Sequence, residues 1–353
     1  MARINYDLQN DVVNDTQKVV TSTWTNNVNE LTTVYTSSTQ ADLSSATSKG
    51  AFYIEAYNEA TSSASSAVQF AVAYGHKDGG GTLDFTNDTN ALGNSPSKVI
   101  YNQYRQLVFG DETKNFQFPG DLDSINAGNS YTPYDIFVIN VNRARYKNNL
   151  KPGTLNLILS GANDIPLHLT DDSITSTGSA VITNAGRQFN IVSGSSGVRS
   201  GSLTTQVDGS GSYGLYYPDS GFIILNPAAV SHSIETTNAL VNTGSHTNAK
   251  NHQHFLDLII SGGSFIVDSE EKISSKYYFT RIKNSEFNFT TNPSFIDDSG
   301  NLRYSTMENN PKVYITTVGL YNDTNDLIAV AKLSQPIAKD FSKEALIRVK
   351  LDY

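Results

Sequence analysis

Short segments in which hydrophobic and polar residues alternate recur along the whole chain. In the segment 51–58, Phe52 and Ile54 fall on one side of an extended strand, because successive side chains point to opposite faces. The segment 67–75 repeats the pattern after a polar connection, so the two segments predict a β-hairpin. The last residues, 345–353, alternate strictly and predict a paired strand that closes a sheet.

The middle of the chain has the rhythm of an antiparallel β domain. Strands are predicted at 135–142 and 154–160, and the segment 213–227 predicts a hairpin. Turn-forming residues arrive about every ten residues, which is typical of sandwiches and barrels. Residues 226–251 are less regular and indicate a short helix or a mobile loop, followed by a strand at 255–260.

One segment, 96–109, carries a clear helical pattern. Ser95 can cap its start, a proline occupies the first turn, and Gly110 follows its end. The hydrophobic residues predict a stripe that packs on a sheet, made of Val99, Ile100, Tyr104, Leu107 and Val108. A plain packing helix is the simplest interpretation, but Tyr101 and Arg105 are also predicted to form an exposed face for a partner.

The segment 315–337 predicts another hairpin, near the end of the chain. Its first arm leads to Gly319, Leu320 and Tyr321, a polar turn follows, and a second apolar run completes it. We expect one arm of this hairpin to pair with the last strand. The side chains predicted to face inward from that strand are Ile347, Val349, Leu351 and Tyr353.

These patterns predict a mainly β protein of several small antiparallel domains, sandwich-like or barrel-like, with the one clear helix at 96–109. A chain of 353 residues has room for two or three domains, since single cores usually stop growing before ~250–300 residues. We place a β-rich N-terminal domain with the helix at 1–130, a middle β domain at 131–262 and a C-terminal β docking module at 263–353.

The composition fits a β architecture and argues against nucleic acid as a partner. Only 38% of residues are hydrophobic and 17% charged, while Tyr (19) and Phe (16) are frequent, which suits short strands with polar faces. The net charge of −9 opposes phosphate binding, which needs a basic face. Arg143, Arg145 and Lys147 alternate with uncharged residues, which predicts the solvated face of a strand.

The chain has no cysteine, which excludes disulfides, thiolate nucleophiles and cysteine-based zinc sites. Its first residues lack the apolar segment of a secretory signal, so we expect no export by the general secretory route. The longest apolar runs, such as FLDLII, are far shorter than the ~20 residues of a membrane helix, so we expect no membrane association.

No motif in the chain indicates catalysis. Gly209, Gly211 and Gly214 match G-x-G-x-x-G, but the hairpin pattern after them predicts a turn rather than a dinucleotide site. Adjacent carboxylates such as Asp171 and Asp172 would point to opposite faces of a strand and cannot flank one bond. We therefore predict a protein that is not an enzyme and needs no cofactor.

Three histidines, His246, His252 and His254, fall close together. On a strand, His252 and His254 would point the same way, about 6.5–7 Å apart. Two imidazoles without a neighbouring carboxylate make a poor metal site, so we predict no bound metal. A threefold assembly would gather six imidazoles, and the pattern resembles the iron-binding His-x-His pairs of phage tail tips and spikes, so an oligomeric site stays open.

The blocks NSEFNFTTNPSF (284–295) and NNPKVYITTVGLYNDTNDLIAVAKLSQPIAKDFSKEALIRVKLDY (309–353) resemble the C-terminal module of virion structural proteins from large contractile-tailed bacteriophages. Such modules occur in baseplate and fibre-attachment components. The part VGLYNDTNDLIAVAKLSQP is also similar to a hairpin of phage tail-collar fibre proteins, in which Gly often stands at Asn325 or Asp326. The segments 135–157 and 214–227 are similar to parts of the same large proteins.

The resemblance implies a structural protein of the phage tail or baseplate that docks other virion proteins or fibres. It would be made in the host cytoplasm, form homo-oligomers within the particle and contact partners through Gly319, Leu320 and Tyr321 of the hairpin and through Tyr101 and Arg105 of the helix. Three other roles stay open: a neck or collar component, a receptor- or glycan-binding fibre protein, and a virion-associated depolymerase. Frequent Tyr and Phe suit large protein interfaces, because aromatic rings supply rigid contact area.

Overall fold

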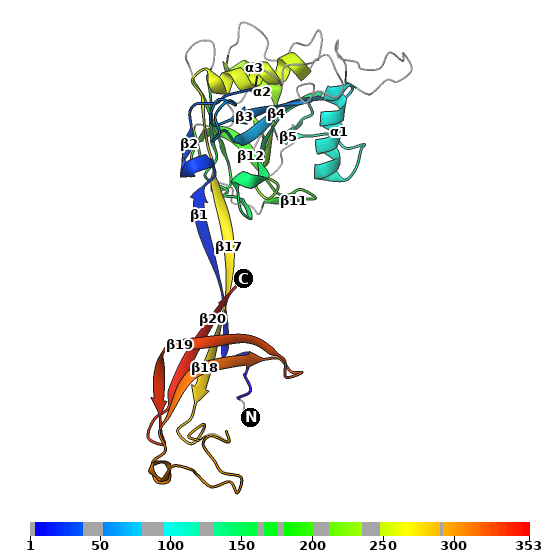
Figure 1. Cartoon of the computed structure of the whole chain (residues 1–353). Coiled ribbons are helices and arrows are strands. Elements are labelled where there is room, and N and C mark those ends of the chain that lie inside the picture. The colour runs from blue at the N-terminus through cyan, green and yellow to red at the C-terminus, as the bar shows by residue number, and fades with distance from the viewer. Residues whose placement is uncertain are drawn as a thin grey trace. The chain divides into compact units, whose positions relative to one another are not determined.

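The computed structural model describes residues 4–37, 52–79, 95–119, 130–160, 166–174, 180–200, 212–234, 248–289 and 292–353, and over these ranges the chain is mainly antiparallel β, as predicted. Its contacts divide the chain into two compact units (Figure 1). We call Val19–Glu271 the large unit, and Met1–Lys18 with Lys272–Tyr353 the small unit. No helix in the described ranges is both long and apolar enough to cross a membrane.

These units differ from the three domains predicted from the sequence. The expected boundary between residues 130 and 131 has no counterpart, because β4 (Val68–His76) pairs with β7 (Asp135–Val141) along seven residues and joins both segments in one sheet. The first residues of the chain belong with its end, since β1 (Val12–Ser22) lies beside β17 (Asp268–Ile282). Strand pairing between distant segments therefore sets the division.

The large unit is built on one curled antiparallel sheet. Its main path contains, in spatial order, β2 (Glu30–Leu31), β16 (Ser264–Ile266), β9 (Asn156–Leu159), β10 (Leu167–Asp171), β12 (Gly186–Ser195), β14 (Gly214–Tyr217), β15 (Phe222–Leu225), β7, β4 and β3 (Tyr53–Tyr57). The short strands β11 (Val181–Thr183) and β13 (Val198–Arg199) also pair with β12, and β5 (Phe118–Pro119) pairs with β6 (Ser130–Tyr131). The predicted hairpins β3–β4 and β14–β15 are confirmed.

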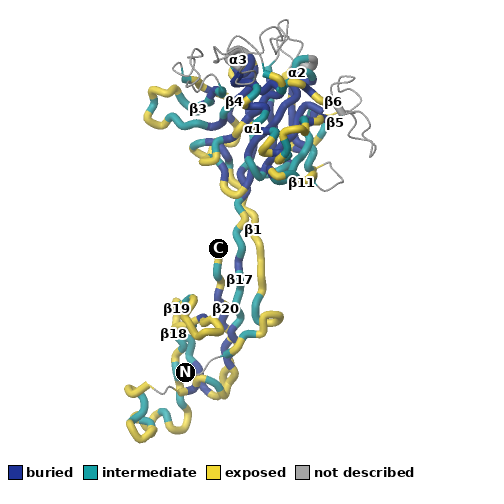
Figure 2. The backbone as a smooth tube through the Cα atoms, turned by 90° about the vertical axis from the view of Figure 1, so that its right-hand side faces the viewer, coloured by how far each residue is buried: buried dark blue, intermediate teal, exposed yellow. Residues whose placement is uncertain are grey.

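The residues of the central strands are buried (Figure 2), and their side chains divide between two cores. In β7, Phe137 and Ile139 belong to one core, while Ile136 and Val138 belong to a second core on the opposite face. Helix α1 (Pro96–Phe109) covers the second core, and α3 (Asn248–Ile260) contributes to the first. Burial on two sides explains why β7 is almost continuously apolar instead of alternating.

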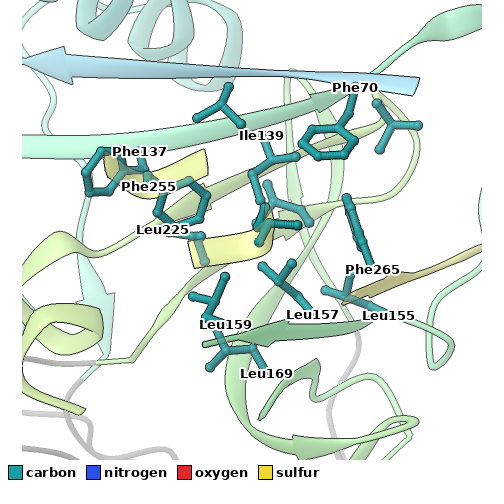
Figure 3. Close-up of a cluster of buried hydrophobic side chains, with 14 of the residues drawn as sticks. Phe70, Phe137, Ile139, Leu155, Leu157, Leu159, Leu169, Leu225, Phe255 and Phe265 are labelled. Carbon is teal, nitrogen blue, oxygen red and sulfur yellow. The ribbon is translucent and has the colours of Figure 1, made fainter. Parts of the chain in front are cut away.

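The first core is rich in aromatic rings (Figure 3). Phe137 of β7 stacks on Phe255 of α3 with ring centroids 4.8 Å apart. Trp24 packs against Phe265 at 4.9 Å, and its indole N–H donates to the Phe265 carbonyl oxygen at 2.8 Å. The only tryptophan of the chain is thus fixed in the core of the large unit.

Helix α1 has the predicted bounds and caps, but it buries a different stripe. Its N-cap Ser95 accepts from the Lys98 amide, and Gly110 ends it in the left-handed conformation. Val99 and Leu107, expected inside, are 42% and 44% exposed. The buried stripe follows positions i, i+3, i+4 and i+7 more closely, and consists of Ser97, Ile100, Tyr101, Tyr104 and Val108.

The described residues contain two further α-helices, α2 (Pro227–Ile234) and α3. The strand expected at 255–260 is wrong, because this segment is the second half of α3. His252, Phe255, Leu256 and Ile259 are buried at helical spacing, and a short apolar run fits both a helix and a strand. The strand face expected at Arg143–Arg145 is also wrong, since these residues form a 3₁₀ turn capped by the Asn142 side chain.

The small unit combines two sheets around its own core. In one, β17 lies between β1 and β20 (Ala345–Asp352). The first residues of β17 belong to the large unit, where Ser269 and Glu270 pair with β8 (Asn149–Leu150). The other is the hairpin of β18 (Val313–Tyr321) and β19 (Leu327–Lys339). The prediction that β20 pairs with this hairpin is wrong, because β20 pairs with β17 from Ser275↔Asp352 to Ile282↔Ala345.

Candidate docking surface

The β18–β19 hairpin contains the three residues that the sequence singled out, and each has a different environment. Leu320 is buried in the core of the small unit. Tyr321 is 39% exposed, and Gly319 lies on the exposed side of the strand. A Cβ at Gly319 would lie 3.0 Å from the Tyr321 ring and 3.2 Å from Leu327 Cδ1, so the missing side chain gives these two groups room to lie across the strand.

The hairpin turn is held by its own side chains. The Asn322 side-chain oxygen accepts from the Asp326 amide at 2.7 Å and from the Thr324 hydroxyl at 2.8 Å. The single Thr324 hydroxyl hydrogen is shared between this oxygen and an Asp326 carboxylate oxygen at 2.6 Å, and its donation to the carboxylate is the main reason that the pKa of Asp326 is below its ordinary value. Asn325 has a φ of 70°, a left-handed conformation that asparagine tolerates better than most residues.

One face of the hairpin is occupied by the core of its own unit. Leu320 packs there with the buried β20 residues Ile347 and Val349 and with Ile282 of β17. The partly buried hairpin residues of this cluster are Ile315, Val318, Ala329, Ala331, Leu333 and Ile337. The hairpin therefore has a fixed inner face, and its outer face is oriented by that packing.

The outer face carries apolar side chains that no described residue buries. We define the hairpin outer patch as Tyr321, Leu327, Ile328 and Val330, which are 39%, 52%, 66% and 57% exposed. Val330 pairs with Gly319, and Leu327 pairs with Tyr321, so these residues come together at the end of the hairpin beside the turn. Leu327, Ile328 and Val330 were not singled out from the sequence. The sequence feature that indicates them is the run Leu-Ile-Ala-Val, because four consecutive apolar residues of a strand cannot all face one core.

The helix residues proposed as an exposed interaction face do not form one. Tyr101 is fully buried, and burial raises the pKa of its hydroxyl. The Arg105 guanidinium lies 5.7 Å from the Tyr101 ring centroid and donates to the Asn102 side chain at 2.8 Å. Tyr101 is therefore a core residue, and this part of the predicted partner surface is corrected.

The two neighbouring histidines that the structure describes lie on a helix and not on a strand. His252 is buried and His254 is exposed, because residues two apart on a helix point to different sides. The expected pair of parallel imidazoles is therefore wrong. His246 lies outside the described residues, and within the described ranges no three His, Asp or Glu side chains come together as a metal site requires.

The adjacent carboxylates Asp171 and Asp172 diverge, as expected for a strand. Asp171 is buried and accepts from the Gly153 amide at 2.9 and 3.0 Å, while Asp172 accepts from the Asn190 amide and side chain, both at 2.9 Å. Burial raises the pKa of both carboxyl groups. Each carboxylate holds a separate stretch of backbone in place, which is a structural use of the acid.

Comparison with known proteins adds no relative, since no family model, no curated protein and no solved structure matches the chain.

Proposed function

We propose that the protein is a non-enzymatic structural component of a contractile phage virion, a tail or baseplate protein on which other virion proteins or fibres dock. The observation that carries the proposal is the two-sided hairpin. Its inner face is part of the core of the small unit, and its outer face presents the hairpin outer patch to solvent. These residues lie in the block that resembles phage virion proteins, which supplies the virion context.

The physical chemistry of the patch suits a protein partner. Contiguous exposed apolar side chains mark interaction sites, and a tyrosine among aliphatic residues is a common centre of binding energy. The ring of Tyr321 lies over Gly319 beside Leu327, so part of its freedom is already lost before a partner binds. The side-chain hydrogen bonds of the turn hold the end of the hairpin in the same way.

The first experiment asks whether the protein belongs to a particle. Phage particles that encode this chain are purified on a density gradient and analysed by quantitative mass spectrometry. We expect the protein in a fixed ratio to the tail proteins, and antibodies against it should label the tail by electron microscopy. A protein that stays in the soluble fraction of the lysate, with none in purified particles, would show that the virion assignment is wrong.

The second experiment asks whether the patch is the docking surface. Immobilised protein is mixed with the proteins of dissociated particles, and the captured virion protein is identified by mass spectrometry. Ile328→Asp should abolish capture, whereas Leu346→Asp should leave it intact, because both side chains are 66% exposed but only Ile328 lies in the patch. Equal capture by both variants would show that the hairpin outer patch is not the docking surface. Binding to a glycan array in place of a virion protein would favour the receptor-binding role.

A further inference from the structure

Strand β1 is an exposed edge strand with apolar side chains on both faces. Its one hydrogen-bonded neighbour among the described strands is β17. Val13, Val19 and Val20 are 48%, 37% and 41% exposed, and every residue from 13 to 21 is exposed. Val13 and Val19 point to one face and Val20 to the other, because side chains alternate along a strand.

Proteins usually protect such edges against pairing with another chain. Charges, proline and bulges are the common means. The outward face of the edge strand β20 carries Arg348 and Lys350, and β19 contains Pro336. The middle of β1 carries only one acid, Asp15, and one base, Lys18, between two pairs of valines. The edge of β1 is therefore less protected against pairing with a second copy than that of β20, because its two charges have opposite signs whereas Arg348 and Lys350 have the same sign.

The sequence of β1 has the same character when it is read in either direction from Thr16. Asp15 and Gln17 flank the centre, Asn14 and Lys18 follow, and then come two valines on each side, Val12 and Val13 before and Val19 and Val20 after. Each step outward thus meets a residue of the same class, polar near the centre and valine at the ends. Such a segment is complementary to a second copy of itself laid antiparallel.

Symmetry limits the possible registers of that pairing. Two identical antiparallel strands are related by a two-fold axis perpendicular to the sheet. The axis runs midway between the two copies of one residue, and the side chains of every cross-strand pair point to the same face. With the axis at Thr16, Val13 faces Val19 and Val12 faces Val20. An axis at Asp15 would oppose two carboxylates, and an axis at Gln17 would place Val19 against Asp15, so the Thr16 register is favoured.

We propose that β1 is a self-association edge that pairs antiparallel with β1 of a second copy of this chain, about a two-fold axis at Thr16. The two β1 strands then become the inner strands of a continuous sheet. The pairing covers the exposed valines and satisfies the outward backbone groups of both strands. It does not depend on the proposed virion role, because the observations concern this strand alone.

The expected strength of the pairing is modest. One strand edge on each copy gives an interface below the ~1,200–2,000 Å² of stable complexes, and interfaces of that size associate weakly. Sedimentation of the full chain should therefore show a monomer–dimer equilibrium that depends on concentration. Within a particle, the high local concentration of copies would favour the dimer.

Site-specific crosslinking tests the register, and the absence of native cysteines makes single-cysteine variants unambiguous. Paired residues lie about 4.5–5.5 Å apart between Cα atoms, within disulfide range, so oxidised Thr16→Cys should form a covalent dimer. Lys18→Cys is the control, because two copies of residue 18 would be about 13 Å apart. A mixture of Asn14→Cys and Lys18→Cys should crosslink, although neither does so alone.

A charge test in the sedimentation assay complements the crosslinks. Thr16→Lys places two like charges on the axis and should weaken self-association about tenfold, and mixing it with Thr16→Glu should restore it. Both substitutions are at an exposed position, so folding should be unaffected. A chain that stays monomeric at its highest soluble concentration would overturn the proposal. So would a Thr16→Cys crosslink no stronger than that of Lys18→Cys.

Discussion

Two neighbouring residues of β20 offer a sharp test of how the small unit is stabilised. Ile347 is 4% exposed and Leu346 is 66% exposed, although they are adjacent in the chain and similar in size. Ile347 belongs to the core that includes Val349, Ile282 and Leu320. Replacing each residue in turn by alanine therefore separates burial from strand propensity at nearly the same place.

The expected change in free energy of unfolding differs greatly between the two variants. Ile347→Ala leaves a cavity in a packed core, which typically costs about 2–5 kcal/mol. Leu346→Ala removes an exposed side chain, and such changes usually stay within about 0.5 kcal/mol. A domain has only about 5–15 kcal/mol of stability in total, so Ile347→Ala should remove a large part of the stability of the small unit.

The assay must report the two units separately. Trp24 lies in the core of the large unit, so its fluorescence follows the unfolding of that unit. Hydrogen exchange of peptides from 272–353, read by mass spectrometry over a denaturant series, follows the small unit. Ile347→Ala should lower the denaturant midpoint of these peptides and leave the Trp24 transition almost unchanged, because the cores of the two units have no residue in common.

Two results would refute this reasoning. If Leu346→Ala lowered the midpoint as much as Ile347→Ala, the alternation of β20 would not define an inner face. If the Trp24 transition moved together with the peptides of 272–353, the two cores would unfold as one cooperative body, and the division of the chain into separately stabilised units would be wrong.

Three further predictions concern single contacts of the small unit. Lys339→Met should lower the free energy of unfolding by about 1–3 kcal/mol, measured by thermal melting, because the buried Lys339 ammonium donates to the Asn284 carbonyl and the Asn288 side chain, both at 2.8 Å. Lys332→Met, at an exposed position of the same strand, is the control and should change the stability little. Asn325→Val should lower the free energy of unfolding by about 1–2 kcal/mol and Asn325→Gly should leave it almost unchanged, because the backbone of residue 325 is in the left-handed conformation. Equal melting temperatures of the two variants would contradict this turn geometry. In an NMR titration, the pKa of Asp326 should lie below the ordinary 3.8, and it should rise in the Thr324→Ala variant. The ionised Asp326 carboxylate stabilises the fold above pH 3.8, and this stabilisation is lost as the pH falls through the lowered pKa.

The sequence predicted most of what depends on neighbouring residues. The hairpins β3–β4, β14–β15 and β18–β19 and the bounds and caps of α1 are confirmed. Alternation and turn residues act over a few positions, so a local pattern contains enough information to specify them. The alternation of β20 is confirmed for Ile347 and Val349, but Tyr353, at the end of the chain, is 70% exposed.

Errors arose where distant segments compete for the same partner. Nothing in the sequence of β20 says whether it pairs with β17 or with the nearer hairpin, since both offer strands of suitable pattern. The sequence predicts a strand at 255–260, the second half of α3, because the apolar run is short and the helical stripe includes His252, which is polar in sequence but buried in the fold. Tyr101 lies outside the apolar stripe that the sequence predicts for α1, and its burial follows from the rotation of the packed face of the helix toward Ser97, Ile100 and Tyr104.

The candidate docking surface illustrates why a motif and a surface are different objects. The sequence singles out Gly319, Leu320 and Tyr321 as one unit, but their environments in the fold differ. Gly319 leaves room for neighbouring side chains, Leu320 is buried in the core, and the ring of Tyr321 is exposed. Removing Leu320 would change the patch by unseating the hairpin, whereas changing Ile328 would alter the patch and leave the core intact. A test of docking therefore has to use exposed residues of the patch, such as Ile328, and not Leu320, because only the exposed residues separate binding from folding.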